Sequence, residues 1–193
     1  MKAITLWQPW ASLVALGLKT IETRSWQTAH RGPIAIHAAA RCPKPQDLKR
    51  LVGDDERVFD AWFEAGLVSE NGRRDLIPRG VVIATANLVD VAPIGRWDSF
   101  RTGIFEGDGG DFPGRHVVVV HLDGEVVLDH PPGCGHPHGT VCSIAPQLPF
   151  GDFTPGRYAW LLEDVERVDP PVAARGGQRI WTWERSSPVV GCR

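Results

Sequence analysis

The stretch GLKTIETR, residues 17–24, carries three charged side chains within six residues and directly follows an apolar run. If its glycine ends a helix and residues 20–26 form a strand, alternation puts Glu22 and Arg24 on one face, with Lys19 at the mouth of the strand. Such a cation–anion–cation cluster can hold an anionic or amide-bearing ligand, or tune a lysine toward base chemistry. The simpler alternative is a solvated strand face with a surface ion pair, which contributes little to stability.

The segments around this stretch predict short elements separated by glycine and proline turns. Residues 3–7 favour a strand, and Pro9 suits the first turn of a helix over residues 10–16. Gly17 is expected to adopt a left-handed conformation that ends this helix and turns the chain toward Lys19. Further strands are expected over residues 34–38, 81–91, 117–122, 125–128 and 158–165, a helical stretch over 46–65, and an irregular acidic loop over 94–113. Pro170 and Pro171 are expected to break the strand before them.

Residues 17–24 resemble the GxKxxExR motif of ASCH domains, which are relatives of the PUA domains that bind RNA. Other blocks agree in the expected order: WQPW at 7–10, GPIAIHAA at 32–39, the strand over 82–91, and the blocks at 158–163 and 177–181. The resemblance covers roughly residues 1–40, 78–92 and 157–184.

With the short, glycine-bounded strands, this resemblance implies an α+β fold, namely a PUA-like small mixed β-barrel with flanking helices. A single domain is expected over residues 1–184, with insertions around 43–76 and 95–150 and a frayed tail over 185–193.

The resemblance further implies a cleft for single-stranded RNA or a modified nucleoside, with the motif at its centre. The candidate catalytic residues are Lys19, Glu22 and Asp90, and the candidate ligand-binding residues are Trp7, Gln8, Pro9, Trp10, Arg24, Trp26, His37, Gln178 and Arg179. Arg24 and Lys19 would contact phosphate or base edges, while an indole offers a stacking face. Asp90 either meets Lys19 or caps the following turn. His37 either lines the pocket or is a hydrogen-bonded core residue.

Two other functions stay open. Some small ASCH proteins are N4-acetylcytidine amidohydrolases and others are linked to RNA cleavage, so the resemblance also allows a hydrolase. Lys19 matches the lysine of the amidohydrolases, but Glu22 stands where they have a threonine, and a carboxylate cannot serve as a hydroxyl nucleophile. The other alternative is a protein-interaction module that uses exposed tryptophans as its contact surface. The chain has eight tryptophans in all.

Composition and charge narrow these functions. The chain has 193 residues, of which 42% are hydrophobic, and a net charge of −2, as expected for one globular domain. Proteins that bind duplexes by neutralising many phosphates are usually more basic, whereas a pocket for one nucleotide needs few charges. No apolar run is long enough to cross a bilayer, and no signal peptide is evident, so a cytoplasmic protein is expected.

Four residues within nine positions suggest zinc ligands: Cys134, His136, His138 and Cys142. Their CxHxHxxxC pattern is not one of the usual zinc spacings, so a loop without metal is favoured over a chelating site. Neither a metal nor a cofactor is expected.

Overall fold

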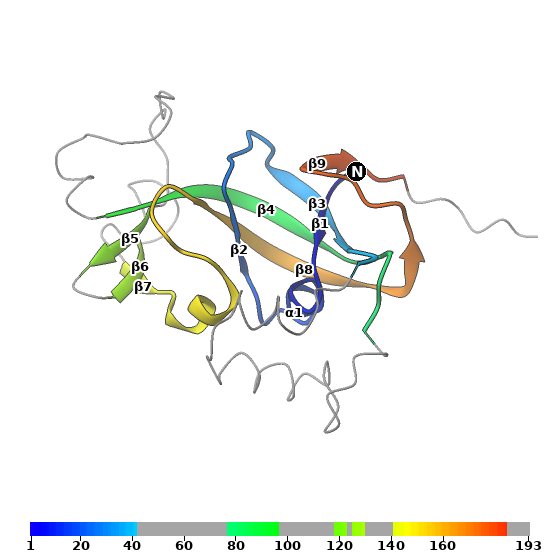
Figure 1. Cartoon of the computed structure of the whole chain (residues 1–193), viewed down its shortest axis with the longest axis horizontal. Coiled ribbons are helices and arrows are strands. Elements are labelled where there is room, and N and C mark those ends of the chain that lie inside the picture. The colour runs from blue at the N-terminus through cyan, green and yellow to red at the C-terminus, as the bar shows by residue number, and fades with distance from the viewer. Residues whose placement is uncertain (42–76, 97–117, 123–124, 130–140, 185–193) are drawn as a thin grey trace, which may run out of the picture.

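The computed structural model describes residues 1–41, 77–96, 118–122, 125–129 and 141–184 (Figure 1). The strands are β1 (Lys2–Leu6), β2 (Ile21–Arg24), β3 (Gly32–Ala38), β4 (Val81–Arg96), β5 (Val118–Leu122), β6 (Glu125–Asp129), β7 (Val141–Ser143), β8 (Tyr158–Ala173) and β9 (Ile180–Thr182), and the helices are α1 (Trp10–Ala15) and the 3₁₀ helix η1 (Ala145–Phe150). Six strands form one curled sheet in the order β9-β1-β3-β4-β8-β2. The predicted helix over 46–65, most of the expected acidic loop and the tail from 185 lie outside the described residues.

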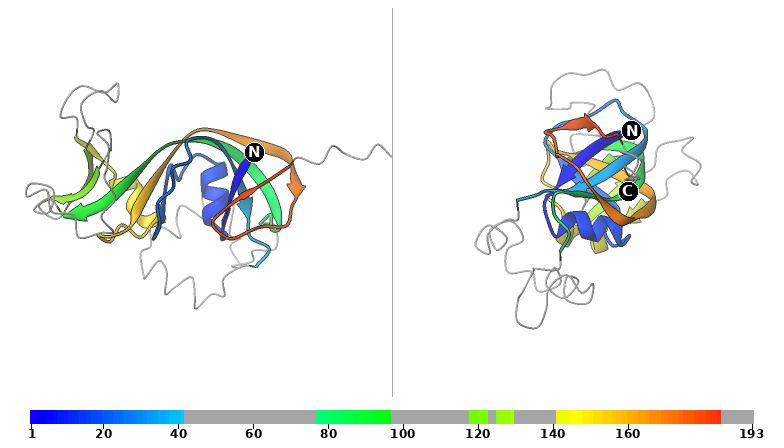
Figure 2. Two further views of the ribbon diagram at one scale, coloured as in Figure 1. Left: turned by 90° about the horizontal axis from the view of Figure 1, so that it is seen from above. Right: turned by 90° about the vertical axis from the view of Figure 1, so that its right-hand side faces the viewer.

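The curled sheet is mixed. β1 and β3 run parallel, while the other neighbours within the six-stranded order are antiparallel. β4 and β8 contain 16 residues each and arch together over α1, so the sheet closes partway around the helix (Figure 2). This half-barrel with a helix on its concave side confirms the predicted α+β fold built on a small mixed barrel.

The core fills the space between α1 and the sheet. Its fully buried side chains include Ile4, Ile34, Ile36, Leu88 and Trp160, which the two-residue period of each strand points inward. The buried face of α1 meets them through Ala11 and Val14. Burying an aliphatic side chain of this size contributes about 1.5–3 kcal/mol to folding, so this cluster holds the helix and sheet together.

Strand β4 is longer than the sequence predicted. It continues through Ile94, Gly95 and Arg96, which pair in parallel with β5, where the sequence indicated the start of an irregular loop. β5 and β6, two of the predicted strands, pair with each other in antiparallel register, and β6 pairs with β7. The extension therefore carries a small second set of strands at one end of the molecule (Figure 1).

Strand β8 also continues where the sequence predicted a break. Arg167 pairs with Ala84 and Val172 with Val82, so four residues of β8, 168–171, stand opposite a single residue of β4. Pro170 and Pro171 lie in this irregular stretch, where the ladder does not require the N–H donors that prolines lack. The prediction of a break was wrong because a bulge lets a strand pass through prolines. Among the described residues, no helix has the length and hydropathy needed to span a membrane.

Candidate functional site: a charged cleft beside strand β2

The turn after α1 directs the motif into the protein. Gly17 has a φ of 73°, in the left-handed region predicted for it. The backbone N–H groups of Leu18 and Lys19 both donate to the carbonyl of Leu13, which closes the end of the helix. Lys19 thereby enters the interior as the chain begins β2, whose alternation buries Ile21 and leaves Glu22 partly exposed, as predicted.

Lys19 is completely buried. Its Nζ donates to the carbonyl oxygens of Ile21 and Phe150, each at 2.6 Å, and lies 3.3 Å from Glu22 Oε2. Burial lowers the pKa of Lys19, and the Glu22 carboxylate opposes this shift. Three acceptors match the three hydrogens of an ammonium group, so each proton of Lys19 has a partner within the protein.

Glu22 joins the buried lysine to an arginine nearer the surface. Glu22 Oε1 lies 3.1 Å from Arg24 Nε, and Arg24 Nη2 donates to the carbonyl of Thr5 at 3.1 Å. β2 is therefore tied to β1, which is not its neighbour in the sheet. The Nε position makes an ion pair with Glu22 but no hydrogen bond, so this buried N–H is left without a hydrogen-bond acceptor.

The 3₁₀ helix η1 supplies the opposite side of the site. Gln147 Oε1 accepts hydrogen bonds from the backbone N–H groups of Thr20 and Ile21, and Gln147 Nε2 donates to the carbonyl of Leu18. Beyond η1, the N–H of Asp152 donates to Thr23 Oγ1 at 3.0 Å. With the bond from Lys19 to Phe150, these contacts hold residues 147–152 against the motif.

Gly151 lets this segment approach β2 closely. A Cβ at this position would lie 2.9 Å from Phe153 Cε2 and 3.0 Å from Thr23 Cγ2, closer than packed carbon atoms normally come. A glycine is therefore required here by the close approach of two chain segments.

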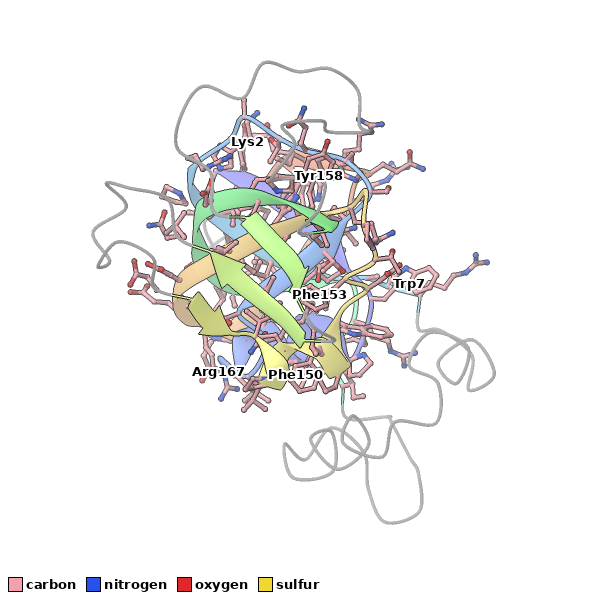
Figure 3. All side chains as sticks on the ribbon, turned by 90° about the vertical axis from the view of Figure 1, so that its left-hand side faces the viewer. Lys2, Trp7, Phe150, Phe153, Tyr158 and Arg167 are labelled. Carbon is pink, nitrogen blue, oxygen red and sulfur yellow. The ribbon has the colours of Figure 1, made fainter. Side chains whose placement is uncertain are left out.

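Between these segments lies a cleft of about 270 Å³. It is lined by Thr5, Leu6, Trp7 and Trp10 from the end of β1 and the start of α1, by Glu22, Thr23 and Arg24 from β2, and by Pro149, Phe150, Gly151, Asp152 and Arg157 from η1 and the segment after it. Trp7 is 49% exposed and lies at the edge of the molecule (Figure 3). The cleft therefore combines indole surface with guanidinium and carboxylate groups.

A second carboxylate–guanidinium pair lines the cleft. Arg157 Nε donates to the Asp152 carbonyl at 3.1 Å and lies 3.4 Å from Asp152 Oδ2. Burial would raise the pKa of Asp152, but two hydrogen bonds from Thr154 and the charge of Arg157 outweigh it and hold the pKa below its ordinary value. The cleft lining thus carries two arginines and two carboxylates, with Lys19 buried behind it.

Four of the predicted site residues line the cleft: Trp7, Trp10, Glu22 and Arg24. Gln8 and Pro9 are buried beside it and do not line it. Gln8 Oε1 accepts the N–H of Ser12 in the first turn of α1, and Gln8 Nε2 donates to the carbonyl of Pro78. This glutamine positions the helix that carries Trp10.

Three other predicted residues, Trp26, Gln178 and Arg179, lie elsewhere, and Trp26 is half-buried against the core, edge-on to Trp160. The guanidinium of Arg179 lies over the ring of Trp26, 5.4 Å from its centroid, in a cation–π contact. Gln178 is exposed. None of the three lines the cleft.

His37 lies in the core and does not line the cleft. Its Nε2 lies 3.1 Å from the carbonyl of Ala174 and its Nδ1 lies 3.3 Å from Thr5 Oγ1, while the ring packs edge-on against Trp181. Burial lowers the pKa of His37, and the hydrogen bond to Ala174 opposes this shift. The structure therefore places His37 in the alternative setting of a hydrogen-bonded core histidine.

Asp90 pairs with Arg31 rather than with Lys19. Asp90 Oδ1 lies 2.9 Å from Arg31 Nη2 and accepts the N–H of Val91 at 2.7 Å. Of the two alternatives for Asp90, the meeting with Lys19 was wrong, because Glu22, three residues further along the chain, already pairs with this lysine.

Sequence reasoning missed the contribution of residues 149–152 and of Arg157. These residues are more than 120 positions from the motif, and no local pattern relates them to it. Of the possible zinc ligands, Cys134, His136 and His138 lie outside the described residues. Among the described residues, no group of three or more histidine, cysteine, aspartate or glutamate side chains is arranged to hold a metal ion.

Comparison of this chain with known proteins identifies its family. The ASCH domain model matches residues 4–109. A human protein named Activating signal cointegrator 1 is 48% identical over 48 residues, which cover 25% of this chain and 8% of the human protein. The mouse protein of that name is 46% identical over 48 residues, with the same coverage. This chain therefore aligns with only a small part of the length of these relatives.

Proposed function

Because this chain belongs to the ASCH domain family, we propose that its cleft binds one nucleoside unit, either free or as an unstacked nucleotide of single-stranded RNA. The observation that carries the proposal is the lining of the cleft, where Trp7 and Trp10 lie together with Arg24 and Glu22. Unstacked bases are recognised by aromatic stacking and by hydrogen bonds to their polar edges, and both kinds of group are present here.

The size of the cleft supports one small ligand. Its volume of about 270 Å³ lies just below the range of roughly 300–1,000 Å³ typical of sites for drug-sized ligands. A base with its sugar suits this space, whereas a duplex does not enter it. Readout of a single unstacked nucleotide is therefore favoured over binding along a helix.

The charge of the cleft supports the same conclusion. Arg24 and Arg157 are each paired with a carboxylate, Glu22 and Asp152 respectively, so these four side chains sum to zero. The whole chain is also slightly acidic, with a net charge of −2. Affinity would then come from stacking and directed hydrogen bonds, because broad neutralisation of phosphates needs an excess of positive charge.

The geometry favours binding over the hydrolase alternative. A general base needs a free lone pair within reach of its substrate, but Lys19 is fully buried and its Nζ lies within 3.3 Å of three acceptors. Glu22 is held between Lys19 and Arg24. Incubation with N4-acetylcytidine tests this alternative directly, and release of cytidine by the wild-type protein would support hydrolysis.

Calorimetric titration of the four common ribonucleosides and of short single-stranded RNAs tests the proposal. Arg24→Gln removes a charged hydrogen-bond donor, a loss worth about 1.5–3 kcal/mol, so the affinity for the single-stranded RNAs should fall roughly 10- to 100-fold. Arg31→Gln is a matched control, since Arg31 also pairs with a carboxylate, Asp90, but does not line the cleft. Equal affinities in the two variants, both shown to be folded, would contradict the proposed site.

A further inference from the structure

Both arginines of the cleft, Arg24 and Arg157, keep guanidinium donors that no group of the protein uses among the described residues. The binding of a bare nucleoside does not require two such arginines. Arg157 is held through Nε, by both the carbonyl and the carboxylate of Asp152. Among the described residues, its two terminal nitrogens have no hydrogen-bond partner. Arg24 uses Nη2 on the carbonyl of Thr5 and its buried Nε faces Glu22, whereas its Nη1 has no hydrogen-bond partner among the described residues. Terminal guanidinium donors are thus left unused on two side chains that line the same cleft.

The neighbouring carboxylates do not block an anion from this place. Glu22 is engaged by Lys19 on one oxygen and by Arg24 on the other. Asp152 Oδ1 accepts hydrogen bonds from the N–H and the hydroxyl of Thr154, and its Oδ2 faces Arg157. Both carboxylates are therefore already satisfied, and the fully buried Lys19 adds one positive charge behind the cleft.

We propose that Arg24 and Arg157 together hold one phosphate group, so that the cleft takes a nucleotide rather than a bare nucleoside. Two guanidinium forks match the tetrahedral oxygens of a phosphate and bind it through several hydrogen bonds at once. The arginines are only 24% and 28% exposed, so their charge is screened less than that of fully exposed side chains. This inference rests on the proposed function and adds a residue, Arg157, that lies outside the sequence motif.

The anchoring of Arg157 has a physical consequence for affinity. Asp152 is held by Thr154, and it in turn holds the Nε edge of Arg157, which limits the rotamers of this long side chain before any ligand arrives. A side chain that is already oriented loses less conformational entropy on binding. Two ligands could supply this phosphate group. A free mononucleotide carries it as a monoester, and an RNA strand carries it as a diester between nucleotides.

The test compares each of the four ribonucleosides with its 5′-monophosphate by calorimetry on the full chain. For wild-type protein, we expect the monophosphate of the preferred base to bind at least tenfold more tightly than the nucleoside. In Arg157→Gln this difference should disappear while the nucleoside affinity changes less than about threefold. Arg157→Lys keeps the charge without the fork and should retain part of the difference, which also covers the case in which Arg157→Gln fails to fold. Arg167→Gln, an exposed site on β8 outside the cleft, should behave as wild type.

The outcomes separate this inference from the proposed function. Equal affinity of wild-type protein for nucleoside and monophosphate would overturn the phosphate site and leave nucleoside binding intact. An equal loss of both affinities in Arg157→Gln would also overturn it. Absence of binding to nucleosides, mononucleotides and trinucleotides would overturn both. A trinucleotide with internal diesters that shows the same dependence on Arg157 would identify an RNA strand as the source of the phosphate, and dependence confined to the mononucleotide would identify a free nucleotide.

Discussion

Replacement of Lys19 by methionine distinguishes a structural lysine from a catalytic one. Methionine keeps much of the aliphatic length but removes the ammonium group that binds the carbonyls of Ile21 and Phe150 and faces Glu22. The contact between β2 and η1 through Phe150 would be lost. We expect Lys19→Met to destabilise the fold and to open the cleft at the same time.

The magnitude follows from the environment of the side chain. Loss of one partner from a buried ion pair typically costs about 3–5 kcal/mol, and a buried carbonyl left without its donor costs about 1–3 kcal/mol. Relief of the lysine's own burial offsets part of this sum, and Glu22 keeps Arg24 as a partner. A net loss of about 3–5 kcal/mol is therefore expected, which lowers the melting temperature of a chain this size by about 6–20 °C.

Urea denaturation followed by tryptophan fluorescence measures this loss, because the chain has eight tryptophans. Lys2→Met is the matched control, since Lys2 is an exposed lysine on β1 and its replacement should change the free energy of unfolding by less than about 0.5 kcal/mol. If Lys19→Met proves as stable as Lys2→Met, Lys19 does not hold the segments together. Base chemistry at Lys19 would then regain support.

Three further predictions follow from single contacts. The pKa of His37 is lowered in the folded protein, so as the pH falls the unfolded chain takes up a proton at this histidine before the folded chain does, and the stability contributed by neutral His37 above about pH 6.5 should decline. Urea titrations at several pH values should show a shallower decline of the unfolding free energy in His37→Gln than in the wild type. Equal pH slopes in the two proteins would refute this. Gly151→Ala should destabilise the fold by about 1–3 kcal/mol through the clash with Phe153 and Thr23 and should weaken ligand binding, whereas a variant with wild-type melting and affinity would refute the packing argument. Trp7→Ala should reduce affinity for the nucleoside or RNA by about 1–3 kcal/mol with little loss of thermal stability, because the indole is half exposed; unchanged affinity would remove Trp7 from the binding surface.

The setting of His37 shows why a pattern on one strand does not decide a function. A histidine on an apolar strand fits either a pocket or the core, and its strand neighbours are the same in both cases. The side chain lies in the core because Thr5 and the carbonyl of Ala174, from two other parts of the chain, supply its hydrogen-bond partners. A cavity would leave one ring nitrogen free for a ligand, and here both have partners within the protein.

The sequence by itself determined the parts of the protein that depend on neighbouring residues. The helix end at Gly17 depends on a left-handed residue, and the alternation of Ile21 with Glu22 depends on the pleat of a strand. These are local consequences of backbone geometry and could be predicted along with the fold class. The pairing of Glu22 with Arg24 follows from the same two-residue spacing.

The tertiary structure alone decided which residues face the charged cluster of Lys19, Glu22 and Arg24. Phe150 accepts a hydrogen bond from Lys19, and Arg157 lines the cleft, although both lie more than 120 residues from the motif. Such contacts depend on how the whole chain closes, and a backbone carbonyl leaves no mark in the sequence because every residue carries one. The passage of β8 through Pro170 has the same origin, since only the register against β4 shows where a ladder can omit a donor.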